Sequence, residues 1–280
     1  MIPGMIRTRM MIKAGVYRTV IAFVAVTLIA VSGAAAQTAT FEPTPGQAGK
    51  DVVWVPTPQE LVEKMLDMAK VTPQDIVIDL GSGDGRNVIA AAKRGAHAYG
   101  FEFNPDMVAL SRRKAQEAGV ADRATFIEGD MFEADISKAT VLALFLLPSN
   151  LDKLAPKFLA LPPGTRMVNN TFQVTGWEAD ATETVEGSCT SWCTSHLNII
   201  PAKAAGTWRL GNADLTLTQE FQIVSGTLGT TAISAGRLNG EQISFTVGDT
   251  QYHGKVSGDR MEGTATTKGQ TQSWTATKTK

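Results

Sequence analysis

The stretch that decides the fold of this 280-residue chain is Val77-Ile78-Asp79-Leu80-Gly81-Ser82-Gly83-Asp84-Gly85-Arg86. Its apolar beginning predicts a buried strand, and the turn that follows carries glycine at every second position. Glycine allows the backbone to approach a ligand closely and to adopt positive φ, and a helix that begins after the turn presents free N–H groups. Open α/β folds bind their ligands at the carboxyl edge of such strands. The stretch therefore predicts a small-molecule site at the edge of a parallel sheet.

Strand-like and helix-like segments alternate on both sides of this stretch. Short apolar runs predict strands over residues 76–80, 98–101, 124–127, 140–146 and 166–172. Helical patterns predict helices over residues 87–94, 106–117 and 151–159, and an earlier helix with Thr57 as its N-cap, Pro58 at its first position and Glu60 at its third. Strands separated by helices indicate βαβ units, a parallel sheet and helices on both of its faces.

The composition changes past Pro201, where a second domain is expected to begin near Ala205. Residues 206–280 are rich in Thr and Gly and predict short strands over 215–220, 223–228, 233–238, 243–247, 252–256 and 273–277. Asn239-Gly240 is typical of a tight hairpin turn. Such a chain favours an antiparallel meander that closes, or nearly closes, into a small barrel. We expect Trp208 and Trp274 to lie in its core.

The first 36 residues are typical of a secretory signal peptide. Four basic residues precede an apolar run, Val20 to Val31, that ends in small residues, with Ala34 and Ala36 placed for cleavage before Gln37. An uncleaved membrane anchor is the alternative, although a membrane span needs roughly eighteen or more apolar residues. The predicted organisation is a signal peptide (1–36), a linker (37–50), an α/β domain (51–204) and a β-domain (205–280), exported to the periplasm or held at the membrane.

Charge and histidine spacing argue against a nucleic-acid partner and against a metal site. The chain has 26 basic and 27 acidic residues, and removal of the signal peptide leaves 22 basic residues and a net charge of −5. A nucleic-acid partner is therefore disfavoured. The three histidines, His97, His196 and His253, are too widely spaced in the sequence to indicate a metal site.

The glycine-rich turn does not fit a dinucleotide site but resembles the first motif of the class I S-adenosylmethionine-dependent methyltransferases. A dinucleotide fingerprint needs glycine or alanine where Arg86 stands. The resemblance implies a Rossmann-like seven-stranded methyltransferase sheet and S-adenosylmethionine as cofactor. It implies that Glu102, at the end of the next strand, binds the ribose hydroxyls, and that Asp130 and Met131, after the third strand, contact the adenine. The complete set of implied cofactor-binding residues is Asp79, Gly81, Ser82, Gly83, Asp84, Gly85, Arg86, Glu102, Asn104, Asp130 and Met131.

A finer resemblance covers residues 52–177. The segments Trp54-Val55-Pro56-Thr57-Pro58, Phe145-Leu146-Leu147-Pro148-Ser149, Leu161-Pro162-Pro163-Gly164-Thr165 and Gly176-Trp177 are similar to the protein-lysine methyltransferases that act on the ATP synthase c subunit and the adenine nucleotide translocase. This likeness implies a protein substrate, membrane-associated in those cases, and a role for Trp54, Pro56 and Thr57 in covering the cofactor and binding substrate. The (Asp/Asn)-Pro-Pro-(Tyr/Phe) motif of DNA amino-methyltransferases is missing after the fourth strand.

The chemistry implied is an in-line displacement, in which the acceptor's lone pair attacks the activated methyl group. We expect Phe145, Leu147 and Pro148 to line a desolvating acceptor site, and the sequence identifies no catalytic base. A second hypothesis is an exported, non-catalytic protein of the same fold whose barrel binds a ligand or an envelope partner. Because S-adenosylmethionine is a cytosolic metabolite, the predicted export keeps this alternative open.

Cys189 and Cys193 lie in a segment expected to form a hairpin tip between the last two strands of the first domain. In an exported protein they could form a small-loop disulfide, provided that a turn brings their Cα atoms within about 7 Å. Two free thiols are the alternative, and neither a metal site nor a C-x-x-C redox motif is indicated.

Overall fold

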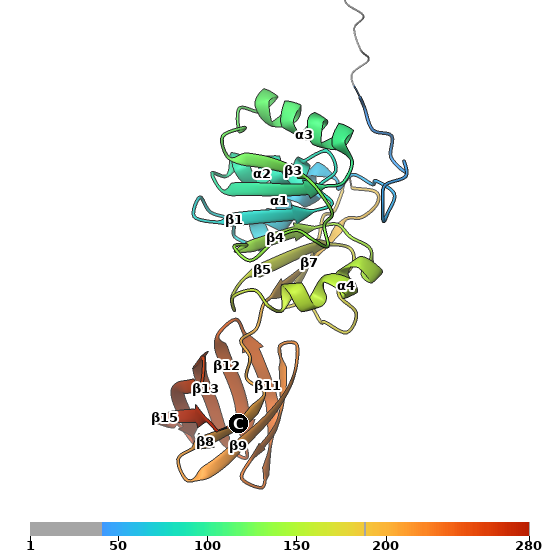
Figure 1. The fold of residues 1–280 in the computed structure, drawn as a ribbon. Helices are drawn as coiled ribbons and strands as arrows, with labels where there is room; N and C mark the ends of the chain where they lie inside the picture. Colours follow the sequence, from blue (N-terminus) through green and yellow to red (C-terminus); the bar gives the residue numbers. More distant parts are fainter. Residues whose placement is uncertain (1–40, 188, 280) are drawn as a thin grey trace, which may run out of the picture. The chain divides into compact units, whose positions relative to one another are not determined.

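The computed structural model describes residues 41–187 and 189–279, which form a seven-stranded mixed sheet followed by a closed barrel (Figure 1). The predicted signal peptide and the start of the predicted linker lie outside these residues. No helix in the described part of the chain is both long and apolar enough to span a bilayer.

The first sheet has the strand order β3-β2-β1-β4-β5-β7-β6, in which the first five are parallel and β7 runs antiparallel to both β5 and β6. Its strands are β1 (Ile76–Leu80), β2 (His97–Glu102), β3 (Ala124–Glu128), β4 (Val141–Leu144), β5 (Arg166–Asn170), β6 (Ala181–Thr184) and β7 (Thr194–Ile199). The helices are α1 (Gln59–Met68), α2 (Arg86–Lys93), α3 (Pro105–Glu117) and α4 (Pro148–Phe158). The predicted alternation and the seven-stranded Rossmann-like sheet are confirmed.

Each face of this sheet has its own hydrophobic core, because successive strand residues point to opposite sides. Val77 and Val141 face the side covered by α1, α2 and α3, whereas Ile78 and Leu142 face the side covered by α4. Helices therefore cover both faces, as the alternation predicted.

The predicted cap of the first helix is wrong by one residue. The helix begins at Gln59, its N-cap is Pro58, and no side chain caps it. Thr57 is buried, and its hydroxyl instead accepts a hydrogen bond from Asn170 Nδ2 at 3.3 Å. Its carbonyl accepts a further hydrogen bond from Arg86 at 2.5 Å. Because these tertiary hydrogen bonds engage Thr57, its side chain does not cap the helix.

The predicted boundary between linker and α/β domain crosses a small hairpin. Gly46 N donates to Trp54 O at 2.8 Å and Trp54 N donates to Gln47 O at 2.9 Å, with an isolated bridge between Ala48 and Val53. Residues 46–54, called the strap, therefore form one structural unit although residue 50 was expected to end a linker.

The second domain is a closed eight-stranded barrel in the order β10-β11-β12-β13-β14-β15-β8-β9. Its strands are β8 (Gly206–Leu210), β9 (Ala213–Glu220), β10 (Ile223–Leu228), β11 (Thr231–Asn239), β12 (Gln242–Val247), β13 (Thr250–Ser257), β14 (Arg260–Thr267) and β15 (Gln270–Lys278). Trp208 and Trp274 are buried in its core, as expected, and Trp208 Nε1 donates to Ala204 O at 2.8 Å. The first strand starts one residue after the expected boundary.

The barrel also contacts the segment that links β5 to β6. Trp177 stacks on Phe221 with ring centroids 4.9 Å apart, and Arg237 forms an ion pair with Asp180 at 2.7 Å. Gln222 Nε2 donates to Glu178 O at 2.6 Å. A stacked ring pair beside an ion pair gives this contact both apolar and polar components.

Candidate cofactor site

The glycine-rich loop joins β1 to α2 in a backbone shape that only glycine adopts without strain. Gly81, Gly83 and Gly85 have φ values of 71°, 55° and 80°. Gly83 also lies directly under the indole of Trp54, since a Cβ at this position would be 2.6 Å from Trp54 Nε1. The loop therefore brings its backbone against the strap, and this approach explains the glycine at position 83.

Glu102 at the end of β2 is fixed by the same loop. Its Oε2 accepts a hydrogen bond from Gly83 N at 2.9 Å, and its Oε1 accepts one from Asn104 N at 2.9 Å. Asn104 in turn caps α3, where its Oδ1 accepts from Asp106 N at 2.9 Å. The carboxylate is thus held and oriented by two backbone amides at the edge of the sheet.

Asp79 and Asp84 lie in contrasting electrostatic surroundings. Burial raises the pKa of Asp79 well above its usual range. A hydrogen bond from Asn87 acts to lower this pKa, and the charges of Glu102 and Asp84 act to raise it further. Burial also acts to raise the pKa of Asp84, but hydrogen bonds from Arg86 and Lys114, each 2.8 Å long, outweigh it and lower that pKa. Asp84 is a paired structural anion, whereas Asp79 has no cation bound to it in the described chain.

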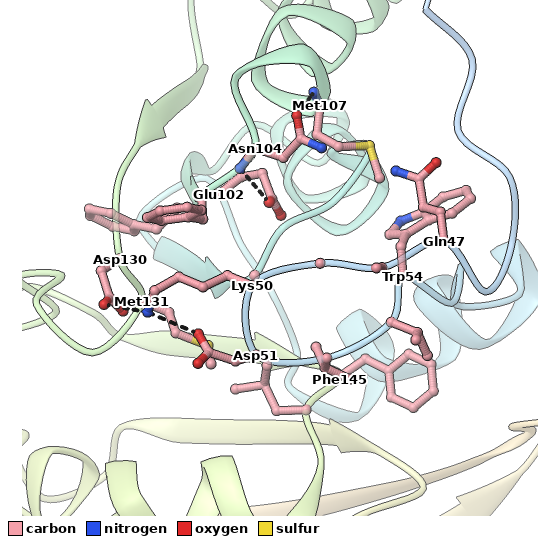
Figure 2. Close-up of a pocket in the computed structure, with 18 of the residues that line it drawn as sticks. Gln47, Lys50, Asp51, Trp54, Glu102, Asn104, Met107, Asp130, Met131 and Phe145 are labelled. Atoms are coloured by element: carbon pink, nitrogen blue, oxygen red, sulfur yellow. Dashed lines mark hydrogen bonds and ion pairs between the residues drawn. The ribbon is translucent and has the colours of Figure 1, made fainter.

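Asp130, after β3, pairs with Lys50 of the strap. Lys50 Nζ lies 2.8 Å from Asp130 Oδ2 and 3.2 Å from Asp51 Oδ2 (Figure 2). The hydrogen bond from Lys50 lowers the pKa of Asp130. The same ammonium group lies over the rings of Phe103 and Phe132, at 5.3 and 5.9 Å from their centroids. The strap thus supplies a cation at the position where the sequence predicted an adenine contact.

These residues line two adjoining cavities. The larger spans about 710 Å³, part of it open to solvent, and includes Glu102, Asn104, Asp130 and Met131. The smaller, of about 320 Å³, includes Asp79, Ser82, Gly83, Asp84 and Arg86. Trp54, Val55, Gly81 and Phe145 line both cavities, and these four residues are called the junction. Small-molecule sites are concave and mostly apolar with a few convergent polar groups, and the larger cavity has this character.

The lining suits S-adenosylmethionine. The carboxylates of Glu102 and Asp130 are acceptors for ribose hydroxyls and an adenine amino group, and the sulfur of Met131 lies beside them in an otherwise apolar wall. In the smaller cavity, Ser82 Oγ and Asn87 Oδ1 are buried without a hydrogen-bond partner. Buried unpaired polar atoms are costly, and a polar ligand group would satisfy them. No cluster of three or more His, Cys, Asp or Glu residues in the described chain is arranged to hold a metal ion.

Comparison with known proteins agrees with this fit. Residues 79–181 match the model of the ANTKMT methyltransferase domain. A protein-lysine N-methyltransferase of Saccharolobus islandicus is 44% identical over 129 residues, which are 45% of this chain and 80% of that protein. The chain belongs to this methyltransferase family. Its cofactor is S-adenosylmethionine, and it is an enzyme of the transferase class; these matches lend no support to the non-catalytic alternative.

Two further matches mark the extent of the similarity. The mouse lysine N-methyltransferase named for the c subunit of ATP synthase is 37% identical over 140 residues, which are 50% of this chain and 56% of that protein. The chain therefore spans little more than half the length of this curated relative. A crystal structure described as an RNA methyltransferase from Salinibacter ruber, in complex with S-adenosyl-L-homocysteine, is 47% identical with a TM-score of 0.50, and the match covers 54% of this chain and 96% of that one.

The structure brings together most of the residues that the sequence singled out. All the predicted cofactor residues except Gly85 line one of the two cavities, as do Trp54, Pro56, Thr57 and Phe145. Gly85 is instead the N-cap of α2 and packs against Phe126. Leu147 and Pro148 are in neither cavity, because β4 ends at Leu144 and α4 begins at Pro148, so both side chains are exposed on the start of the helix.

Sequence reasoning missed Lys50, Phe103 and Met107 of the larger cavity. A single lysine in a polar, glycine-containing stretch is typical of a solvated linker, so no local pattern identifies Lys50. Phe103 and Met107 flank Asn104 in the predicted turn and helix, and their apolar character next to Glu102 was the available signal.

Cys189 and Cys193 form a disulfide in the loop between β6 and β7, with Cα atoms 5.8 Å apart. The turn thus brings the two Cα atoms within the distance of about 7 Å that a disulfide requires. The loop that it closes includes Trp192.

Proposed function

We propose that this enzyme methylates the side-chain amine of lysine in a protein substrate. The observation that carries the proposal is the 44% identity to a protein-lysine N-methyltransferase over 80% of that protein's length. The mouse relatives named for the ATP synthase c subunit and for the adenine nucleotide translocase, at 37% identity each, support the same acceptor class. Substrates in the membrane fraction belong among the candidates.

The junction is suited to an amine acceptor. Trp54, Val55 and Phe145 give it an apolar surface, and Gly81 leaves room for a close approach. A lysine ammonium must lose its proton before it can attack, which costs roughly 4–5 kcal/mol at neutral pH from a reference pKa of about 10.4. An apolar surrounding disfavours the charged form and lowers that penalty. The apolar side chains of the junction therefore favour the neutral amine that attacks the methyl group.

The remaining site residues bind and orient. S-adenosylmethionine, when bound, supplies a methyl group that is already activated on a sulfonium sulfur. Glu102 and Asp130 are placed to hold its adenosine part, and the loop from Gly81 to Asp84 is placed to hold its amino-acid part. Correct alignment of the two reacting groups is worth roughly 7–11 kcal/mol of the barrier, so a strong catalytic base is not required.

RNA is the competing acceptor, because the Salinibacter ruber structure is described as an RNA methyltransferase. The charge of the present chain disfavours it. With 26 basic and 27 acidic residues, the protein lacks the cationic excess that phosphate backbones attract. A test of the acceptor must therefore offer RNA beside protein.

The test has a binding stage and a transfer stage. Calorimetric titration of the full chain with S-adenosylmethionine is expected to show binding that Asp79→Ala and Glu102→Ala weaken strongly. Transfer of a tritiated methyl group is then measured into a membrane-protein extract and into total RNA, with methyl-lysine identified by mass spectrometry. Ile223→Ala, on the exposed surface of the barrel, is the matched control and should behave as the wild type. Label in RNA but not in lysine would contradict the proposal.

Export is also part of the proposal. The signal-like residues 1–36 support it, and so does the Cys189–Cys193 disulfide, since disulfides persist mainly in oxidising compartments. A reporter fused to the C-terminus tests it, with activity expected outside the cytoplasm. A cytoplasmic signal would refute the export.

A further inference from the structure

Three aromatic side chains gather beside the junction. Phe145, Phe172 and Trp192 contact one another with ring centroids 5.6–6.2 Å apart, the two phenylalanines nearly parallel and the indole tilted against both. This group is called the aromatic cluster. Phe145 belongs to it and also lines both cofactor cavities, so the cluster is continuous with the cofactor site.

The topology of the sheet explains why residues so far apart in sequence meet at this place. Phe145 follows β4 and Phe172 follows β5, and these strands are parallel, so both residues lie at the carboxyl edge. Strand β7 runs antiparallel to β5 with Ser195 opposite Asn170, so its beginning lies at the same edge. Trp192, two residues before β7, is therefore delivered to this edge as well.

The backbone around the cluster is strained at two points. Thr171 and Trp192 have φ values of 59° and 58°, a left-handed conformation that is unusual for any residue with a side chain and especially for a β-branched one. Thr171 N donates to Thr194 O at 2.8 Å, and the Cys189–Cys193 disulfide closes the loop that carries Trp192. Strain of this kind persists where the surrounding structure holds it, and it concentrates at functional sites.

The cluster presents aromatic surface to solvent, and Trp192 is 40% exposed. The lysines that lie over aromatic rings in the described chain, Lys50, Lys153 and Lys278, contact rings outside the cluster. The connection from β6 to the disulfide carries the exposed Glu186, which adds negative charge near the cluster in sequence. None of these lysines therefore occupies the cluster, and the exposed indole of Trp192 is available to a cation from a partner.

We propose that the aromatic cluster is the acceptor subsite, where the cationic side chain of the substrate lysine lies before it reaches the junction. The inference rests on the proposed function and specifies its substrate contact. Ammonium groups are attracted to aromatic faces, most strongly to tryptophan, and the aliphatic part of lysine packs on the same rings. Methylation leaves the charge in place, so the cluster binds methylated lysine as well.

The direct test uses a small probe in place of the protein substrate. Nα-acetyl-Nε-trimethyl-lysine methylamide is titrated into the full chain with saturating S-adenosylhomocysteine, together with its neutral isostere in which carbon replaces the ammonium nitrogen. The readout is the indole N–H signal of Trp192 in ¹H–¹⁵N spectra, assigned by its loss in Trp192→Phe. The cationic probe is expected to shift this signal saturably and to bind more tightly than the isostere. Equal binding of the two probes, or a shift confined to another of the five indoles, overturns the inference.

Variants then separate this inference from the proposed function. Trp192→Ala is expected to weaken probe binding roughly 5-fold to 30-fold, the range of a partly desolvated cation–π contact, and to raise KM for the protein substrate with kcat little changed. Its affinity for S-adenosylhomocysteine should match the wild type, which shows that the fold is intact. Lysine methylation with an unchanged KM in Trp192→Ala refutes the subsite and leaves the proposed function standing. Probe binding at Trp192 in an enzyme that methylates no lysine refutes the proposed function instead.

Discussion

Replacement of Gly85 by alanine tests how tightly the cofactor loop is packed. Gly85 is the N-cap of α2 and has a φ of 80°. An alanine Cβ there would lie 2.7 Å from the ring of Phe126 and 2.9 Å from Ser111 Cβ, closer than carbon atoms approach in folded proteins. Phe126 lies in the hydrophobic core that α1, α2 and α3 cover, and Ser111 of α3 is fully buried, so neither side chain moves freely.

Two terms contribute to the expected loss of stability. A residue with a Cβ in the left-handed region costs about 1–2 kcal/mol relative to glycine. Overpacking of a well-packed core costs a further ~1–3 kcal/mol. The free energy of unfolding should therefore fall by about 2–5 kcal/mol in Gly85→Ala.

Gly119→Ala is the matched control. Gly119 follows α3 with a φ of 69°, and an added Cβ would meet no atom within 4 Å. Only the conformational term applies, so we expect a loss of about 1–2 kcal/mol. Urea unfolding followed by circular dichroism at 222 nm reports on this domain, because all the described helices belong to it. If the two variants lose the same stability within about 0.5 kcal/mol, the packing argument is wrong.

Three other predictions follow from single contacts. Lys50→Ala should bind S-adenosylhomocysteine more tightly by calorimetry, because the adenine then has no lysine to displace from Asp130; weaker binding would show that Lys50 assists the cofactor. Asp79→Asn should stabilise the ligand-free protein, because burial raises the folded pKa of Asp79 above its unfolded value. The wild type therefore loses stability as pH rises from the unfolded pKa toward the folded pKa. Urea titrations should show that the stability advantage of the variant grows with pH and vanishes in acid. Phe221→Ala and Trp177→Ala should show a coupling of about 0.5–1.5 kcal/mol in a double-mutant cycle of unfolding, and additive losses would mean that their stacking adds nothing.

Periodicity predicted most of the fold because the elements are amphipathic or fully apolar. Strand β1 has the predicted bounds, and each other predicted element of the sheet overlaps the observed one. Strand β14 was not delimited in the sequence, because among its eight residues, Arg260–Thr267, only Met261 and Ala265 are buried. Its place in the barrel depends on pairing with β13 and β15, which no local pattern records.

The residues that the methyltransferase resemblance implied for the cofactor come together at the cavities because they stand at the ends of strands and within a glycine-rich turn. Glu102 ends β2 and Asp130 follows β3, and the carboxyl ends of these two strands meet at one edge of the sheet, independently of the loops between them. The acceptor side was less predictable, since it depends on loops. Phe172 and Trp192 are joined to Phe145 through the antiparallel pairing of β7 with β5, and the sequence does not show that register.

The point at which β4 ends decides which of the following residues lie beside the cofactor cavities. The strand expected over residues 140–146 ends at Leu144, so Phe145 leaves the sheet and turns toward the cofactor cavities. Leu146 remains buried and lines the larger cavity, while Leu147 becomes the exposed N-cap of α4. Proline at the first position of α4 explains this early start, because its missing N–H and fixed φ suit the first turn of a helix. The helix start at Pro148 therefore leaves Phe145 beside the cofactor cavities and excludes Leu147 and Pro148 from them.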